Sequence, residues 1–215
     1  MEFSKNLVLI VSISSLLFLH ATTTTAIIPL LETKVNKLCN GVTDPVLCIK
    51  SILPNIKGNF NPYKAVEVEI IAAKTQVVKT ANLINALLTS PTCSKGLKES
   101  LTICKSQYEM MLDDVNAAIP LIEKRDHVEA KFKFSALFSY KGSCDQAFET
   151  GPPQPANLIK EEAALKNIGG NVLDILKVID DKDFAMRLKK GLIPNFSTVS
   201  SPPNKCQNVI GSCTL

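Results

Sequence analysis

Apolar residues recur at alternating steps of four and three between residues 97 and 122, and this spacing restricts what the segment can fold into. On an α-helix such positions fall on one face, whereas a half-buried strand would need strict alternation. The sequence therefore predicts a long amphipathic helix that turns one stripe toward a core. The stripe comprises Leu97, Leu101, Cys104, Tyr108, Met111, Val115, Ala118 and Ile122.

Three further segments show helical spacing, and each has recognisable ends. Asn61-Pro62 places an N-cap before a proline at the first helical position, and this helix stops at residues 89–91. Asp126 with Glu129 resembles a capping box that opens the next helix, which ends at Gly151. The apolar faces are Val66, Ile70, Ala73, Val77, Ala81, Ile84 and Leu88; then Ala130, Phe134, Leu137, Phe138, Cys144 and Phe148; then Leu158, Leu165, Ile168, Val172, Ile175 and Ile179.

Short connections between these long helices favour antiparallel neighbours, so the predicted fold is an all-α, up-down-up-down four-helix bundle. No segment shows strand alternation. Gly169-Gly170 lies inside the last helix and costs about 1 kcal/mol per glycine relative to alanine.

The cysteines support the same architecture. The midpoint between Cys104 and Cys144 is residue 124, which lies beside the turn predicted from capping. In an antiparallel hairpin closed there, the two residues come level, and a disulfide between them is geometrically natural. By the same reasoning, Cys39 and Cys48 flank a turn and predict a disulfide-stapled helical hairpin before the bundle.

Three cysteines remain, namely Cys93, Cys206 and Cys213, and they cannot all pair within one chain. The last two lie in a segment containing serines and prolines, residues 192–215, which we expect to be a flexible tail. This tail also holds Asn195, in the sole N-glycosylation sequon.

The first residues resemble a signal peptide. Lys5 precedes an apolar run over residues 7–19, too short for a membrane anchor, and small residues follow up to Ala26. We expect residues 1–26 to be removed and the protein to be secreted without a membrane segment. The remaining organisation is an N-terminal hairpin over 27–58 and a bundle over 59–191, which together form one domain over 27–191.

Several function classes lack the residues they need. The net charge of +4 is spread along the chain without a basic run, which argues against a nucleic-acid partner. His127 is the only histidine after the predicted cleavage site, so no nucleophile has an evident base. Neighbouring carboxylates such as Glu161-Glu162 point about 100° apart on a helix, so they cannot act as a catalytic pair. No two cysteines have the close spacing of a metal site. We expect no catalysis, no metal and no cofactor.

The chain resembles the plant invertase and pectin methylesterase inhibitors. The resemblance rests on the Cys39 and Cys48 spacing, on the second cysteine pair, and on the local runs 101–104 and 135–137 with Tyr108 and Phe148. It covers about residues 31–188. It implies a four-helix bundle that inhibits a secreted, cell-wall (apoplastic) carbohydrate-active enzyme by forming a one-to-one complex that occludes the substrate cleft.

The resemblance leaves two targets, pectin methylesterase and acid invertase. In invertase inhibitors of this family, a Pro-Lys-Phe tripeptide in the turn between the second and third bundle helices enters the invertase active site. This chain has His127-Val128-Glu129 there, without the cation or the ring. A carboxylate approaching catalytic carboxylates would be repelled, so the sequence favours pectin methylesterase.

Each candidate contact residue also has a purely structural interpretation. N-capping alone would explain Asp126 and Glu129, whether or not a partner binds there. A solvated side chain at a helix start would explain His127. Phe132 and Tyr140 lie off the apolar stripe, which would make them exposed anchors, although aromatic residues are more often core. A further alternative, a helical carrier of a small apolar ligand, would need a hollow core, which the large stripe residues should fill. The candidate contacts are Glu109, Asp113, Asn116, Asp126, His127, Val128, Glu129, Phe132 and Tyr140.

Overall fold

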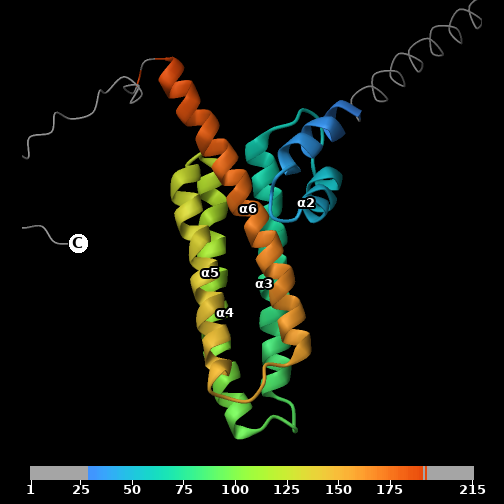
Figure 1. Cartoon of the computed structure of the whole chain (residues 1–215), viewed down its shortest axis with the longest axis vertical. Helices are drawn as coiled ribbons and strands as arrows, with labels where there is room; N and C mark the ends of the chain where they lie inside the picture. Colours follow the sequence, from blue (N-terminus) through green and yellow to red (C-terminus); the bar gives the residue numbers. More distant parts are fainter. Residues whose placement is uncertain (1–28, 191, 193–215) are drawn as a thin grey trace, which may run out of the picture. The chain divides into compact units, whose positions relative to one another are not determined.

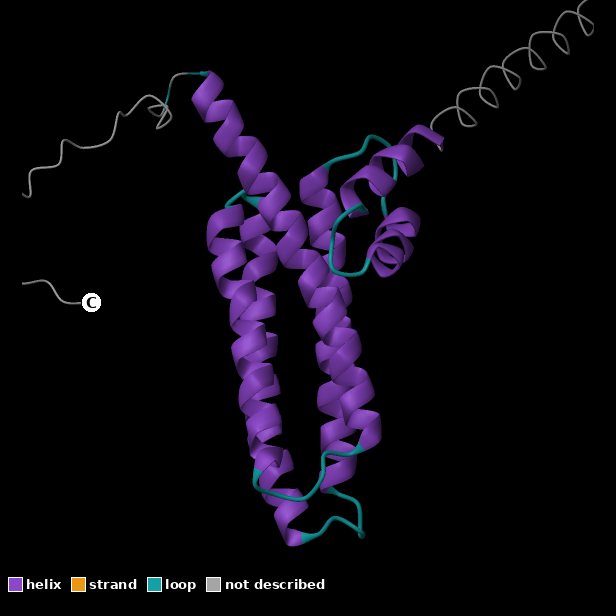
Figure 2. Ribbon diagram, viewed as in Figure 1, coloured by secondary structure: helices purple, strands orange, loops and turns teal. Residues whose placement is uncertain are grey.

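The computed structural model describes residues 29–190 and residue 192, and these residues form helices and no strands. This result confirms the predicted all-α class. Figure 1 labels the helices, and Figure 2 shows the long ones running side by side. The elements are α2 (Pro45–Ile52), the 3-10 helix η1 (Leu53–Asn55), α3 (Pro62–Leu88), α4 (Lys95–Glu123), α5 (His127–Glu149) and α6 (Ala156–Lys189), preceded by helical residues 29–39.

The N-terminal hairpin has the predicted form. Residues 29–39 make its first helix, and α2 makes its second. Asp44 caps α2 by accepting a hydrogen bond from the Leu47 amide at 3.0 Å. The Cys39–Cys48 disulfide joins the two helices, with Cα atoms 5.8 Å apart, which confirms that pairing. Helices this short are marginal alone, so the covalent link and the contacts to the long helices hold them in place.

The ends of α3, α4 and α5 follow local capping chemistry. The Asn61 side chain accepts a hydrogen bond from the Tyr63 amide at the start of α3, as predicted. Ser94 does the same for Leu97 in α4, and Asp126 for Glu129 in α5. The predicted stripes form the core, and most of their residues are buried. Helix α4 packs against both α3 and α5.

The glycine pair in α6 allows a close approach. A Cβ built on Gly170 would lie 2.7 Å from the Cβ of Thr43 in the hairpin. A Cβ on Gly169 would lie 3.1 Å from the Phe138 ring of α5. The cost of these glycines to helix propensity is therefore offset by packing that only glycine permits at position 170.

The described chain divides into two compact units after Asp180, so the last turns of α6 fall in the second unit. That second unit exposes Phe184 and Met186. The predicted signal peptide, Asn195, Cys206 and Cys213 lie outside the described residues. Among the described helices none is long and apolar enough to cross a membrane. The same residues contain no cluster of three or more potential metal ligands.

Candidate functional site

The predicted contact residues lie on the α4–α5 hairpin, and a disulfide fixes the register of its two helices. Cys104 and Cys144 are fully buried, and their Cα atoms are 4.5 Å apart, which confirms the second predicted pair. One level away, the Ser100 hydroxyl on α4 donates to the Ala147 carbonyl on α5 at 2.6 Å. The two helices therefore run antiparallel and are linked at the end far from their connecting turn.

The connecting turn reverses the chain at Arg125, whose φ of 62° lies in the left-handed region. The Asp126 amide then donates to the Leu121 carbonyl at 2.8 Å, which satisfies a carbonyl at the end of α4. The Asp126 carboxylate caps α5 by accepting from the Glu129 amide at 3.2 Å. Asp126 and Glu129 are both exposed, so capping and partner contact are compatible at this turn.

His127 is buried, and the expectation of a solvated side chain is wrong. It is only 6% exposed. Its Nδ1 lies 3.3 Å from the Tyr63 hydroxyl of α3, and its Nε2 lies 3.5 Å from an Asp180 carboxylate oxygen of α6. The Arg125 guanidinium stands over the Tyr63 ring, 5.5 Å from its centroid. His127 thus anchors the turn to neighbouring helices and is not presented to a partner.

A sequence signal for this burial was present. His127 precedes Ala130, Phe134 and Leu137 by steps of three, four and three, so it continues the apolar stripe of α5. Because histidine is polar, the sequence suggested that position 127 would be exposed. Buried histidines are nevertheless common where their ring nitrogens have hydrogen-bond partners.

Val128 and Phe132 form an exposed apolar pair on α5. The two residues are one helical turn apart, and their side chains are 61% and 68% exposed. Side chains four residues apart lie over one another on a helix face. The structure therefore presents an aliphatic and an aromatic group together, next to the turn, as the off-stripe position of Phe132 predicted.

Tyr140, the other proposed anchor, does not stand free. It is half-buried, and its hydroxyl donates to the Asp114 carboxylate on α4 at 2.9 Å. This hydrogen bond to a carboxylate raises the pKa of the Tyr140 hydroxyl. Tyr140 therefore joins α5 to α4, and its hydroxyl is engaged within the chain.

An exposed polar row runs along α4. Glu109, Asp113 and Asn116 follow one another at steps of four and three and are all exposed. The Lys105 ammonium, one turn away on the same helix, lies 4.0 Å from the Glu109 carboxylate. Surface pairs of this kind contribute little to stability, so the row is available for contacts outside the chain.

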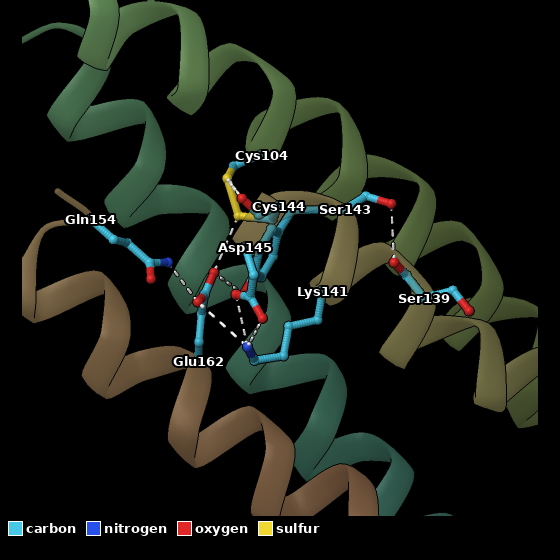
Figure 3. Close-up of polar contacts among 9 residues, drawn as sticks. Cys104, Ser139, Lys141, Ser143, Cys144, Asp145, Gln154 and Glu162 are labelled. Atoms are coloured by element: carbon cyan, nitrogen blue, oxygen red, sulfur yellow. Dashed lines mark hydrogen bonds and ion pairs between the residues drawn. A yellow bond between two sulfur atoms is a disulfide. The ribbon is translucent and has the colours of Figure 1, made fainter. Parts of the chain in front are cut away.

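Behind the disulfide lies a buried polar cluster around Glu162 of α6 (Figure 3). One carboxylate oxygen lies 3.4 Å from the Tyr108 hydroxyl and 3.3 Å from the Cys144 sulfur, which has no proton to donate. The other accepts from Gln154 at 2.7 Å and lies 3.8 Å from the Lys141 ammonium. Lys141 also binds both oxygens of Asp145, at 2.7 and 2.9 Å.

Burial dominates the electrostatics of this cluster. Desolvation raises the pKa of the Glu162 carboxyl, which outweighs the opposing effects of Gln154 and the Lys141 cation. Desolvation, reinforced by the nearby Glu162 carboxylate, also raises the pKa of Tyr108. The Glu162 side chain is only 3% exposed, so the cluster joins α4, α5 and α6 rather than facing a substrate.

The sequence placed Tyr108 and Cys144 of this cluster on apolar stripes, but it did not indicate their polar partners Lys141 and Gln154, and it suggested Glu161-Glu162 only as a catalytic pair. The prediction that the two carboxylates diverge is confirmed. Glu161 instead binds α3, where it accepts from the Gln76 side chain at 2.7 Å and pairs with Lys79 at 2.7 Å. The Lys79 and Gln76 contacts lower the pKa of Glu161.

Fold and site together define a helical protein, stapled by two disulfides, whose candidate site is an exposed surface for contact with another protein. The model of the plant invertase/pectin methylesterase inhibitor family matches residues 33–175, so the chain belongs to that family. The family consists of enzyme inhibitors, in keeping with the expectation that the chain is not an enzyme.

Individual relatives agree with this assignment. A pectinesterase inhibitor from Actinidia deliciosa is 23% identical over 146 residues, which cover 67% of this chain and 78% of that protein. A crystal structure of a pectin methylesterase inhibitor from Arabidopsis thaliana matches with a TM-score of 0.52 at 14% identity, covering 67% of this chain and 95% of that one. A mutant form of an Arabidopsis inhibitor matches over the same shares with a TM-score of 0.57 and 14% identity. At these identities the structural matches support the fold alone.

Proposed function

We propose that this chain inhibits pectin methylesterase by forming a one-to-one complex in which it occludes the substrate cleft. The main observation in support of this proposal is the composition of the α4–α5 turn. The turn directs His127 inward and leaves Val128 and Glu129 exposed, so it offers neither a cation nor an aromatic ring from the positions that reach into invertase. The relative from Actinidia deliciosa, named a pectinesterase inhibitor, supports the same choice. Inhibition of acid invertase is the alternative.

The contact surface of the proposal comprises two sets of residues on the α4–α5 hairpin. Val128 and Phe132 supply apolar area, which typically contributes most to affinity at the centre of an interface. Glu109, Asp113 and Asn116 supply polar contacts, which contribute more to orientation and association rate. The proposed surface also includes Asp126, Glu129 and Tyr140. His127 is buried, and its role in the proposal is to hold the turn in place.

The arrangement we propose for the long helices is the up-down-up-down four-helix bundle. The Cys104–Cys144 disulfide supports the antiparallel pairing of α4 and α5. The Gln76 side chain donates to the backbone carbonyl of Glu161 at 3.0 Å, which supports α3 and α6 as neighbours. Glu162 of α6 contacts both α4 and α5, which supports α6 as the fourth helix of the bundle.

We also propose that the protein is secreted and acts in the cell wall. The support is the signal-peptide pattern, the family, and two buried disulfides, which persist in oxidising compartments. The carrier alternative gains no support from the core, whose stripe positions are filled by large side chains. Depressions of about 500 Å³ along α3, such as the one lined by Val68, Ile71 and Ala72, lie at the surface.

The test is inhibition of purified plant pectin methylesterase and of acid invertase, side by side, by the oxidised protein. We expect loss of esterase activity alone. Loss of invertase activity alone would overturn the choice of target, and inhibition of neither would overturn the proposed function. Size-exclusion chromatography of the mixture would show the expected one-to-one complex.

The contact surface is tested by Phe132→Ala. Removal of an exposed aromatic anchor should raise the dissociation constant for the esterase roughly 10- to 100-fold, since such residues contribute about 1–3 kcal/mol. Ile159→Ala on α6 is the matched control, because Ile159 is an apolar residue that is also half exposed. Equal affinities for the two variants would remove Phe132 from the interface.

A further inference from the structure

The junction between the N-terminal hairpin and the long helices combines buried apolar side chains of the hairpin, such as Val35 and Ile52, with a set of polar contacts. From the hairpin, the Thr43 amide and hydroxyl both donate to one Asp174 carboxylate oxygen of α6, each at 2.8 Å. The Asp44 amide donates to the Asn171 side chain at 2.7 Å, and Asn171 returns a hydrogen bond to the Asp44 carbonyl at 3.0 Å. Asn167 adds a bond to the Asp44 carboxylate at 3.2 Å.

Glu69 of α3 lies fully buried at the same junction. One of its carboxylate oxygens accepts from the Ser51 hydroxyl of α2 at 2.7 Å. The other oxygen is buried and has no hydrogen-bond partner. An ionised carboxylate in that setting would carry charge on an oxygen that is shielded from bulk solvent, which is costly.

The charges around Glu69 add to this cost. The Asp44 carboxylate at the start of α2 is the one whose charge acts on Glu69, and Asp174 of α6 binds Thr43 of the hairpin at the same junction. Among the described residues, no lysine or arginine forms an ion pair with any of these three carboxylates. Desolvation first, with a contribution from the Asp44 charge, raises the pKa of Glu69 to about 7, against the lowering effect of Ser51 and Asn171.

We propose that this junction is a pH-dependent latch, which holds the N-terminal hairpin against α3 and α6 while Glu69 is protonated and loosens as Glu69 ionises. Opening of the latch rehydrates the Glu69 carboxylate and separates it from Asp44. The hairpin stays intact when it detaches, because the Cys39–Cys48 bond and the Asp44 cap lie within it. The proposal concerns a conformational equilibrium and does not depend on the identity of the target enzyme.

The sign and size of the effect follow from linkage. A carboxyl whose pKa is higher in the closed state than in water favours closure below its solvated pKa, and this advantage is lost as pH rises through the closed-state pKa. For a rise from 4.5 to about 7, closure should weaken between those pH values and stay constant above them. Between pH 5 and pH 7.5 the opening equilibrium should grow roughly 10- to 60-fold.

The experiment is amide hydrogen exchange on the full oxidised chain between pH 5 and pH 7.5, with intrinsic rates divided out. The Thr43 and Asp44 amides report the latch directly, since both donate across the junction. We expect their protection to fall with pH, while the Leu47 amide, bonded within the hairpin, and amides of α4 and α5 keep theirs. Constant protection of Thr43 and Asp44 would overturn the proposal.

Two variants identify the titrating group. Glu69→Gln keeps an acceptor for Ser51 but cannot ionise, so its Thr43 and Asp44 protection should not change with pH. Glu99→Gln removes an exposed carboxyl of α4 and should behave like the wild type. Persistent pH dependence in Glu69→Gln would assign the effect to another group and reject the latch. Were that variant not to fold, as α4–α5 exchange would show, the wild-type profile alone would decide.

Discussion

At the scale of single residues, the two glycines at positions 142 and 170 show how one residue type serves different needs. Both lie inside long helices, where glycine is unfavourable by about 1 kcal/mol relative to alanine. Gly142 has open space around a built Cβ, whereas Gly170 lies against Thr43. A side chain added at position 142 would therefore affect only local helix propensity, whereas one added at position 170 would also meet the hairpin.

The pair gives a direct prediction. Gly170→Ala should lower the free energy of unfolding by about 1–3 kcal/mol, because its Cβ would overlap Thr43 and force the hairpin to shift. Gly142→Ala should raise it by about 0.5–1 kcal/mol, through helix propensity alone. Urea unfolding of both variants at one pH measures the difference, and stabilisation by Gly170→Ala would contradict the close approach.

At the scale of elements, the α4–α5 hairpin is fixed at both ends by different means. The turn end relies on the Asp126 cap and the burial of His127. The far end relies on the Cys104–Cys144 bond and the Ser100 hydrogen bond to Ala147. The proposed contact residues Glu109, Asp113, Asn116, Val128 and Phe132 lie between these fixed points, so their spacing is preorganised, which lowers the entropy cost of binding a partner.

Removal of the disulfide should therefore reduce stability without removing a chemical function. The double variant Cys104→Ala, Cys144→Ala opens a loop with a sequence separation of 40, for which chain entropy predicts a loss of about 3–4 kcal/mol. Cys93→Ala, which removes a cysteine outside both disulfides, should stay within about 0.5 kcal/mol of the wild type. Unfolding curves give both values. Loss of inhibition in a folded double variant would assign the bond a direct role in binding.

At the scale of the whole molecule, the apolar pattern predicted the helices and their buried faces, because periodicity records which side of a helix avoids water. Apolar periodicity could not predict which polar side chains are buried. Glu69, Glu162 and Asn171 are buried through partners on other helices, and neither hydropathy nor local spacing encodes those partners. His127 shows the intermediate case, since its position on the stripe was readable but its polarity suggested exposure. The candidate contact residues were predicted from exposure and resemblance, and two of them, His127 and Tyr140, are engaged within the chain.

The buried carboxyls make global stability depend on pH, and neighbouring glutamates in α6 separate the effect from general charge. Because the pKa of Glu162 is raised in the folded state, its neutral form is favoured there, and stability falls as pH rises above the unfolded value of about 4.5. Glu162→Gln should flatten that fall between pH 4.5 and pH 7 in urea unfolding. The pKa of Glu161 is lowered, so its contribution is present above the unfolded value and is lost in acid. Glu161→Gln should therefore leave the slope above pH 4.5 unchanged. An equal slope in Glu162→Gln and wild type would show that the charge on Glu162 is compensated at neutral pH, and that the Lys141 cation, 3.8 Å away, outweighs burial.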